Sequence, residues 1–190
     1  MGNKFQKILS SFGGNQQRRI LLLGLDSAGK TTIVYRVKDS ETVQTIPTIG
    51  FNCEEIVIPK TSINFVVWDV GGQEKLISLW KHYFNNSSGL FFVIDSSDRT
   101  RFESARDELH RVLEDEEMKG VPVVVLANKQ DISGAAKSAE ISEALELNKL
   151  DQRWFVQESV AISGVGLIEA FEKMALFSKE FAKETRKKKM

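Results

Sequence analysis

The sequence predicts an α/β fold built on a doubly wound, mainly parallel sheet. Short apolar runs of strand length, at residues 20–23, 90–94 and 121–127, indicate strands that are buried on both faces of the sheet. Segments with apolar residues at helical spacing separate these runs, and this alternation with short loops is typical of parallel sheets. The chain has 190 residues, of which 42% are hydrophobic, as expected for one domain with short extensions.

The predicted elements follow one another in order along the chain. The strand at 20–23 leads through a glycine-containing loop into a helix over 32–37. Residues 51–59 and 63–69 predict a β-hairpin, and Pro59 places that end at a sheet edge. Thr100 and Glu103 have the spacing of a helix capping box. The apolar faces of the later helices are Phe102, Ala105, Leu109, Val112 and Leu113, then Ile141, Ala144 and Leu145, then Ala170, Met174, Phe177 and Phe181.

Composition argues against several classes of protein. Lys plus Arg and Asp plus Glu both number 26, whereas a dedicated nucleic-acid binder is normally basic, so no nucleic-acid partner is expected. The single cysteine, Cys53, excludes an intramolecular disulfide and a multi-cysteine metal site, and it suits a reducing compartment. No apolar run approaches the ~18 residues of a membrane-spanning helix, and no secretory signal is evident. His82 and His110 show no ligand-like spacing. We therefore expect a cytoplasmic protein.

Residues 24–31, which read GLDSAGKT, match the phosphate-binding pattern G-x-x-x-x-G-K-[ST]. They lie between a buried strand and a helix, where glycines let backbone N–H groups point at phosphates and the helix N-terminus adds positive potential. Lys30 is expected to bridge β- and γ-phosphate oxygens, and the Thr31 hydroxyl is expected to bind Mg²⁺. The nucleotide contacts expected from this segment are Gly24, Leu25, Asp26, Ser27, Ala28, Gly29, Lys30, Thr31 and Thr32.

A second motif predicts which base is bound. Asn128-Lys129-Gln130-Asp131 directly follows the buried strand at 121–127, at a carboxyl end where open α/β sheets bind ligands. The Asp131 carboxylate can accept hydrogen bonds from guanine N1–H and the 2-amino group, whereas adenine would leave it unpaired. Asn128, Lys129 and Asp131 are therefore predicted to bind guanine.

The end of the hairpin carries the residues expected beside the γ-phosphate. Asp69 ends a strand and is a candidate second carboxylate for Mg²⁺, through water. Gly71 and Gly72 allow the backbone to approach the phosphate, and Gln73 is placed to orient an attacking water. The loop at 45–50 offers Thr48 as a second hydroxyl for Mg²⁺, although its chemistry alone favours an ordinary surface loop.

Together these segments closely resemble the ADP-ribosylation-factor (Arf and Arf-like) family of small GTPases. The resemblance rests on the motifs at 24–32, 45–52, 68–73, 95–99, 128–131 and 161–167, on Leu79-Trp80 with Tyr83, and on the start Met1-Gly-Asn3. It covers residues 1 to about 178. The sequence departs from the family pattern at Ile162, in a hairpin that is longer by two residues, and in the segment after Phe177.

The resemblance implies the fold and further site residues. It implies a six-stranded P-loop GTPase sheet with helices on both faces and a hairpin that slides when GTP binds. Thr45 and Thr48 join the nucleotide-binding set, with Thr48 acting as the hydroxyl that senses γ-phosphate and Mg²⁺, and the Ala161 N–H contacts guanine O6. Phe51, Trp68 and Tyr83 form an exposed aromatic triad for effectors, whereas composition alone favours a core role for them.

The N-terminal segment is predicted to form an amphipathic helix. Phe5, Ile8, Leu9 and Phe12 lie at i, i+3, i+4 and i+7 with basic residues beside them, which fits either a membrane surface or packing on the domain. Gly2 fits an N-myristoylation start, and one acyl chain needs a second membrane signal. Basic residues at both chain ends are either solvated faces or attracted to an anionic membrane leaflet.

We therefore predict a GTP-hydrolysing switch with Mg²⁺ as cofactor and GTP or GDP as ligand. Its catalytic residues are Gln73, Lys30 and Thr48, and its metal ligands are Thr31, Thr48 and, through water, Asp69. No arginine finger is evident in the chain, so turnover should be slow without an activating protein.

The division of the chain is expected to be a membrane helix and linker at 1–16, a GTPase domain at 17–178 and a basic tail at 179–190. The expected partners are an exchange factor, an activating protein, effectors or coat proteins, and membranes in the GTP state, with reversible attachment to the cytosolic face of the Golgi in vesicle traffic. Two alternatives are a GTP-binding scaffold with very low hydrolysis, which Gln73 argues against, and a P-loop ATPase or small kinase, which Asp131 argues against.

Overall fold

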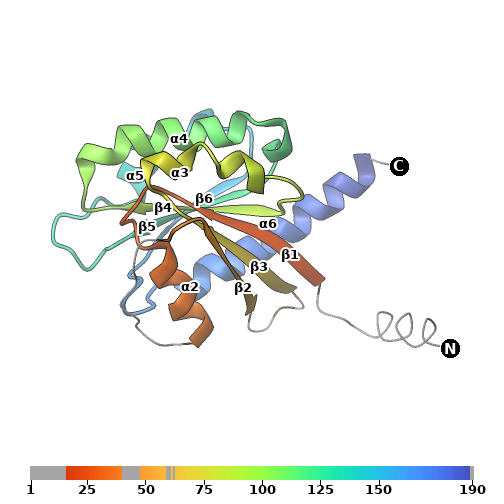
Figure 1. The fold of residues 1–190 in the computed structure, drawn as a ribbon, viewed down its shortest axis with the longest axis horizontal. Coiled ribbons are helices and arrows are strands. Elements are labelled where there is room, and N and C mark those ends of the chain that lie inside the picture. The colour runs from red at the N-terminus through yellow and green to blue at the C-terminus, as the bar shows by residue number, and fades with distance from the viewer. Residues whose placement is uncertain (1–15, 40–47, 59–60, 62, 189–190) are drawn as a thin grey trace.

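The computed structural model describes residues 16–39, 48–58, 61 and 63–188 and contains a six-stranded sheet with helices on both faces (Figure 1). The strand order is β2-β3-β1-β4-β5-β6; β2 and β3 are antiparallel, and the other pairs are parallel. The strands are β1 (Gln16–Leu23), β2 (Phe51–Val57), β3 (Ile63–Val70), β4 (Gly89–Asp95), β5 (Val123–Asn128) and β6 (Trp154–Glu158). This is the predicted doubly wound, mainly parallel sheet.

The helices divide between the two faces of the sheet. They are α2 (Lys30–Asp39), α3 (Glu74–Ile77), α4 (Phe102–Glu114), α5 (Ser138–Ala144) and α6 (Leu167–Lys188), with short 3₁₀ turns η1 (Trp80–Tyr83), η2 (Arg99–Arg101), η3 (Glu116–Met118) and η4 (Leu147–Lys149). In Figure 1, α3 and α4 cover one face, and α2 and α6 cover the other.

Successive side chains of the central strands point alternately into the hydrophobic cores on the two faces of the sheet. In β1, Leu21 and Leu23 pack with α4 and α5, while Ile20 and Leu22 pack with α2 and α6. Every residue of β5 is buried. A strand buried on both faces reads as a continuous apolar run, which explains why the sequence predicted these central strands well.

The edge strand β6 was not placed by the sequence analysis. Its segment, WFVQE, has an exposed Trp154 at one end and the half-buried Gln157 and Glu158 at the other. It pairs with β5 on one side only. Since an edge strand needs fewer apolar residues, this segment lacks the continuous run that marks β4 and β5.

The predicted capping box at Thr100 and Glu103 is wrong. The chain forms the 3₁₀ turn η2 first, so α4 begins at Phe102 and Arg101 occupies its N-cap position without a side-chain cap. The Thr100 hydroxyl instead donates to Asp98 Oδ1 at 2.6 Å. The buried Phe102 anchors the start of α4 in the core.

The segment predicted as a basic tail at 179–190 begins within α6, which continues through position 179 to Lys188. Phe181 packs against the core cluster beside α4, and Arg153 forms ion pairs with Glu180 and Glu184. These contacts extend the helix beyond its fully buried part. Among the described residues, no helix is both long enough and apolar enough to cross a membrane.

Candidate functional site

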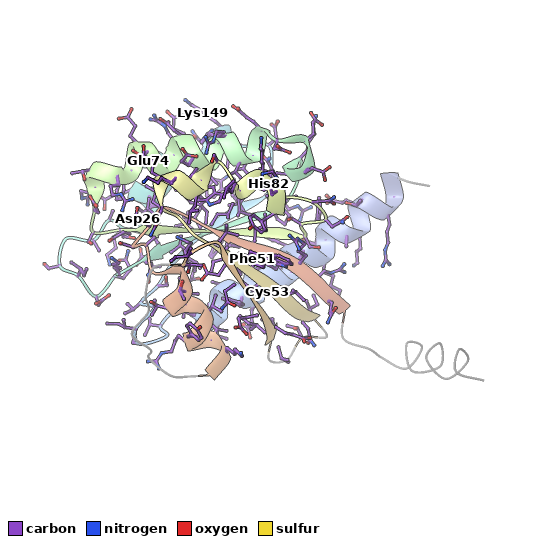
Figure 2. All side chains as sticks on the ribbon, in the orientation of Figure 1. Asp26, Phe51, Cys53, Glu74, His82 and Lys149 are labelled. Carbon is purple, nitrogen blue, oxygen red and sulfur yellow. The ribbon has the colours of Figure 1, made fainter. Side chains whose placement is uncertain are left out.

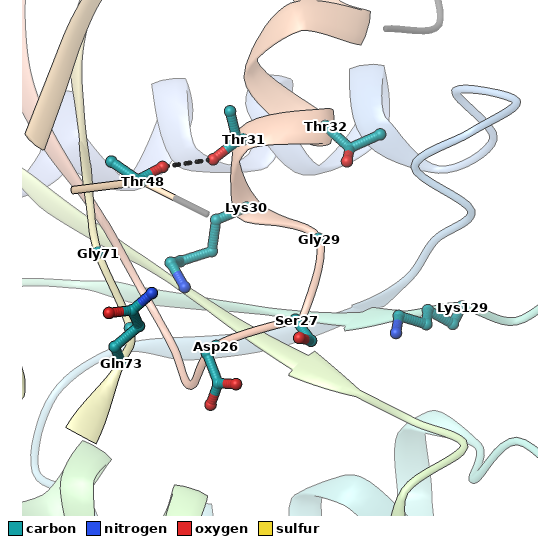
Figure 3. A pocket seen from close by; sticks show the side chains of 11 residues that line it. Asp26, Ser27, Gly29, Lys30, Thr31, Thr32, Thr48, Gly71, Gln73 and Lys129 are labelled. Carbon is teal, nitrogen blue, oxygen red and sulfur yellow. Dashed lines mark hydrogen bonds between the residues drawn. The ribbon is translucent and has the colours of Figure 1, made fainter. Parts of the chain in front are cut away.

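The carboxyl ends of β1 and β3 and the N-terminus of α2 surround a pocket of about 380 Å³ (Figure 3). Because β1 pairs with both β3 and β4 in parallel, the loops that follow these strands emerge at the same edge of the sheet. The residues lining the pocket are Asp26, Ser27, Gly29, Lys30, Thr31, Thr32, Thr48, Gly71, Gly72, Gln73 and Lys129. The structure therefore brings together residues from four of the segments that the sequence predicted to share one site.

Two glycines are required by the close packing of this site. Gly29 has φ +99°, and a Cβ atom there would lie 2.4 Å from Asn128 Nδ2. A Cβ atom on Gly72 would lie 2.2 Å from the Gly24 carbonyl oxygen. The backbone of residue 72 therefore lies directly against the phosphate-binding loop, and Asp26 N–H donates to its carbonyl at 2.9 Å.

The Lys30 side chain lies inside the phosphate-binding loop. Its side chain is buried, and Nζ donates to the carbonyl oxygens of Gly24 at 2.8 Å and Leu25 at 2.9 Å. Burial lowers the pKa of Lys30 from 10.5 to about 8, although the carboxylates of Asp69 and Asp26 act in the opposite direction. An anionic phosphate in the pocket would raise this pKa again, because it favours the charged form.

Three oxygen-bearing side chains meet at one point beside Lys30. Thr31 Oγ1 donates to Asp69 Oδ2 at 2.6 Å and lies 2.8 Å from Thr48 Oγ1, as the dashed line in Figure 3 shows. Thr48 Oγ1 also lies 3.4 Å from Asp69 Oδ2. These are the predicted metal ligands, which lie far apart in the sequence. Thr48 thus lines the pocket beside the other two residues, and its role as a metal ligand stays a prediction.

The Asp69 carboxylate lies in an environment that suits the binding of a cation. It is fully buried, and burial raises its pKa above the ordinary value despite the hydrogen bonds from Thr31 and Thr48. Its Oδ1 atom finds no hydrogen-bond partner among the described residues. Hydroxyl and carboxylate oxygens are ligands that Mg²⁺ accepts, usually together with waters and substrate phosphates. The donor set therefore fits Mg²⁺.

The predicted guanine motif is tied to the phosphate-binding loop. Asn128 Nδ2 donates to the Ala28 carbonyl at 2.8 Å, and Asn128 Oδ1 accepts the Ala161 N–H at 2.9 Å. Lys129 has φ +66°, and its Nζ forms an ion pair with Asp95 Oδ2 at 2.6 Å. Hydrogen bonds from Ser97 and Lys129 lower the pKa of Asp95 against the effect of its burial. Asn128 is thus a buried link between three loops.

The other predicted residues differ in whether they line the pocket. Asp131 is exposed beyond Lys129, and the Ala161 N–H, expected to contact guanine O6, donates to Asn128 in this structure. Gln73 lines the pocket from an exposed position just before α3, at the opposite side from Lys129 in Figure 3. Thr45, Gly2 and the predicted N-terminal helix lie outside the described residues.

The three aromatic residues of the predicted effector surface lie together. The ring centroids of Phe51 and Trp68 are 5.1 Å apart, those of Phe51 and Tyr83 are 5.3 Å apart, and those of Trp68 and Tyr83 are 6.0 Å apart. Phe51 is 48% exposed, and Figure 2 shows it on the same strand as Cys53. The three residues therefore form one cluster, in which Phe51 is exposed while Trp68 and Tyr83 are partly buried and pack against the core. Their role toward effectors stays a prediction.

Sequence reasoning missed two arginines that support these groups. The Arg19 guanidinium lies 3.9 Å from the centroid of the Trp68 ring and donates to the Tyr83 carbonyl at 2.9 Å. Arg101 forms an ion pair with Asp26 in the phosphate-binding loop. Alternation along β1 shows only that Arg19 and Arg18 face opposite ways. No local signal connects residue 101 with residue 26.

The fold and the pocket define a P-loop protein of the small-GTPase class. The family model described as "ADP-ribosylation factor family" matches residues 5–177, and the chain belongs to this family. A solved structure that is similar to this chain is that of the Arl6 BBS3 small GTPase from Trypanosoma brucei with bound nucleotide analogue GppNp. It is 32% identical, has a TM-score of 0.79, and the match covers 87% of this chain and 99% of that chain. The protein is a GTP-binding regulatory GTPase.

Proposed function

We propose that this protein alternates between GDP-bound and GTP-bound states, hydrolyses GTP with Mg²⁺, and binds membranes and effectors in the GTP state. The observation that carries this proposal is the meeting of Thr31, Thr48 and Asp69. Each comes from a different segment, namely the helix that follows the phosphate loop, the loop before β2, and the end of β3. Whatever occupies this point therefore controls the positions of all three segments.

The residues of the pocket have different roles in the proposed hydrolysis. Mg²⁺, when bound, neutralises charge on the phosphate oxygens, and Thr31, Thr48 and Asp69 are the residues that hold it. The Lys30 ammonium, which donates to the carbonyl oxygens of Gly24 and Leu25, supplies positive charge to the transferred phosphate. Gln73 lies at the pocket edge and orients the attacking water. We infer slow intrinsic turnover, with an activating partner supplying ~10³–10⁵-fold.

Selectivity for guanine is assigned to the loops beyond Lys129. Asp131 supplies the carboxylate that pairs with guanine N1–H and the 2-amino group. Asn128 holds this loop against the Ala28 carbonyl and the Ala161 N–H, so the base-binding and phosphate-binding segments move as one unit.

Hydrolysis is tested by comparing wild-type protein with the Gln73→Leu variant. Single-turnover GTP hydrolysis and nucleotide affinity are measured with and without an activating protein of the family. We expect nucleotide affinity to stay within a few-fold while stimulated hydrolysis is lost, because Gln73 acts on the water and not on ground-state binding. Gln17→Leu is the control, since that side chain is exposed, bonds to Glu55 and does not line the pocket. Undiminished stimulated hydrolysis in Gln73→Leu would contradict the role of Gln73.

Membrane attachment is proposed from the amphipathic N-terminal sequence and the acylation signal at Gly2. A myristoyl chain alone binds membranes with a K of only ~10⁴ M⁻¹, so the Phe5, Ile8, Leu9 and Phe12 face must contribute. We propose that this face is released in the GTP state, at the cytosolic face of Golgi membranes, and that the Phe51, Trp68 and Tyr83 cluster then binds effectors.

Liposome flotation of acylated protein tests this coupling. Protein loaded with a non-hydrolysable GTP analogue should float with the vesicles, GDP-loaded protein should not, and Phe5→Ala with Phe12→Ala should weaken flotation without changing nucleotide affinity. Equal flotation in the two nucleotide states would exclude the coupling.

A further inference from the structure

The Asp26 carboxylate places a negative charge in a pocket that is proposed to bind anionic phosphates. Asp26 lines the pocket between Lys30 and Gln73, and its side chain is 48% exposed. If it were uncompensated there, its negative charge would repel a nucleotide phosphate chain. The repulsion would be larger for GTP than for GDP, since GTP carries one more phosphate and about one more charge.

Arg101 compensates this charge through two contacts. Its NH2 group forms an ion pair with the Asp26 carboxylate, and its NH1 group donates to the Asp26 backbone carbonyl at 3.0 Å. Such a paired contact to side chain and backbone fixes the orientation of a residue as well as its charge. Figure 3 shows the Asp26 carboxylate turned away from Lys30 Nζ.

The fold explains why Arg101 reaches this loop. β1 and β4 are adjacent parallel strands, with Leu23 opposite Phe92, so the loops after both strands leave the same edge of the sheet. Arg101 ends the 3₁₀ turn η2, and the buried Phe102 that follows holds the turn in place. The two acids closest to Arg101 in sequence are already engaged. Glu103 pairs with Arg106, and Asp98 accepts the Thr100 hydroxyl.

We infer that Arg101 is a positioning residue that holds the Asp26 carboxylate off the phosphate path and thereby raises the affinity of the pocket for GTP relative to that for GDP. This inference rests on the proposed nucleotide cycle and assigns to it a residue outside every motif that binds nucleotide. In this role Arg101 acts through Asp26 and does not itself touch the phosphates.

The test measures the affinity of purified protein for GDP and for a non-hydrolysable GTP analogue, both with Mg²⁺. Arg101→Gln should lower the ratio of GTP-analogue to GDP affinity by about three- to tenfold, a modest factor because the pair is partly exposed and screened. Asp26→Asn should raise the ratio, because it removes the repulsive charge and leaves Arg101 beside the pocket. The double variant should return the ratio close to the wild-type value.

Arg99→Gln is the matched control. Arg99 belongs to the same 3₁₀ turn and also forms an ion pair, but with Glu140 away from the pocket, so its variant should leave the ratio unchanged. Thermal unfolding of each variant separates loss of fold from a change in the affinity ratio. If Arg101→Gln does not fold, Arg101→Lys, which keeps the charge but loses the two-point contact, should lower the ratio by a smaller factor.

Two results would overturn the inference. One is an unchanged affinity ratio in both single variants. The other is an equal loss of GTP-analogue affinity from Arg101→Gln in the wild-type and Asp26→Asn backgrounds, which would mean that Arg101 contacts phosphate directly. If the wild-type protein bound no guanine nucleotide, the proposed function itself would fail, which is a different outcome from an unchanged ratio.

Discussion

Replacing Lys30 with methionine should stabilise the nucleotide-free protein at neutral pH. Burial lowers the pKa of Lys30 from 10.5 to about 8 in the folded protein, while the unfolded chain keeps the ordinary value. Below pH 8 both states carry the charge, so the folded state bears the full cost of burying it. At ~1.4 kcal/mol per pKa unit, this cost is about 3 kcal/mol.

The sign of the effect changes with pH. Between about pH 8 and 10.5 the unfolded chain binds the proton that the folded protein has released, so the stability of the wild-type protein rises with pH. Methionine also removes two hydrogen bonds to the carbonyls of Gly24 and Leu25, worth ~1 kcal/mol each. The variant should therefore be more stable by about 1 kcal/mol at neutral pH and less stable by about 2 kcal/mol once Lys30 is neutral in both states.

Urea unfolding of nucleotide-free protein in EDTA, followed from neutral to alkaline pH, measures this difference. Lys38→Met is the matched control, because Lys38 lies on the same helix but pairs with Glu54 at the surface. Its effect should be small and nearly constant across this range. A constant stability difference between wild-type protein and Lys30→Met over the same range would refute the assignment of a buried ammonium.

Two further predictions concern base selectivity and the core. Asp131→Asn should weaken guanine nucleotides by up to ~10⁴-fold and admit xanthine nucleotides, because an amide donor pairs with the 2-oxo group. Competition binding of GTP against XTP measures this, and an unchanged preference for GTP would show that Asp131 does not read the base. Phe91→Ala should lower the free energy of unfolding by about 3–5 kcal/mol, since Phe91 is fully buried with its ring 4.6 Å from that of Phe171. Chemical denaturation checks this value, and a loss below about 1 kcal/mol would mean that the site collapses around the gap.

An element could be predicted from the sequence where its environment requires a distinctive local pattern of residues. Strands buried on both faces, such as β5, were found because burial on two sides demands a continuous apolar run. The edge strand β6 was missed because it faces fewer buried neighbours. The start of α4 was misplaced because Thr100 bonds within a 3₁₀ turn, which competes locally with capping.

The sequence by itself determined the chemistry of the site, because phosphate and guanine binding require particular side chains at short, fixed spacings. Lys30, Thr31 and Asp131 were identified on that basis, from segments that each fold locally. Only the tertiary structure decided which distant residues act on them. Thr31, Thr48 and Asp69 were predicted together as metal ligands, but the contact of Arg101 with Asp26 was not. That contact forms because the adjacent parallel strands β1 and β4 bring the loops at their carboxyl ends to one edge of the sheet. Such contacts depend on the order of the strands in the sheet, and that order cannot be predicted from the residues that neighbour each partner in the sequence.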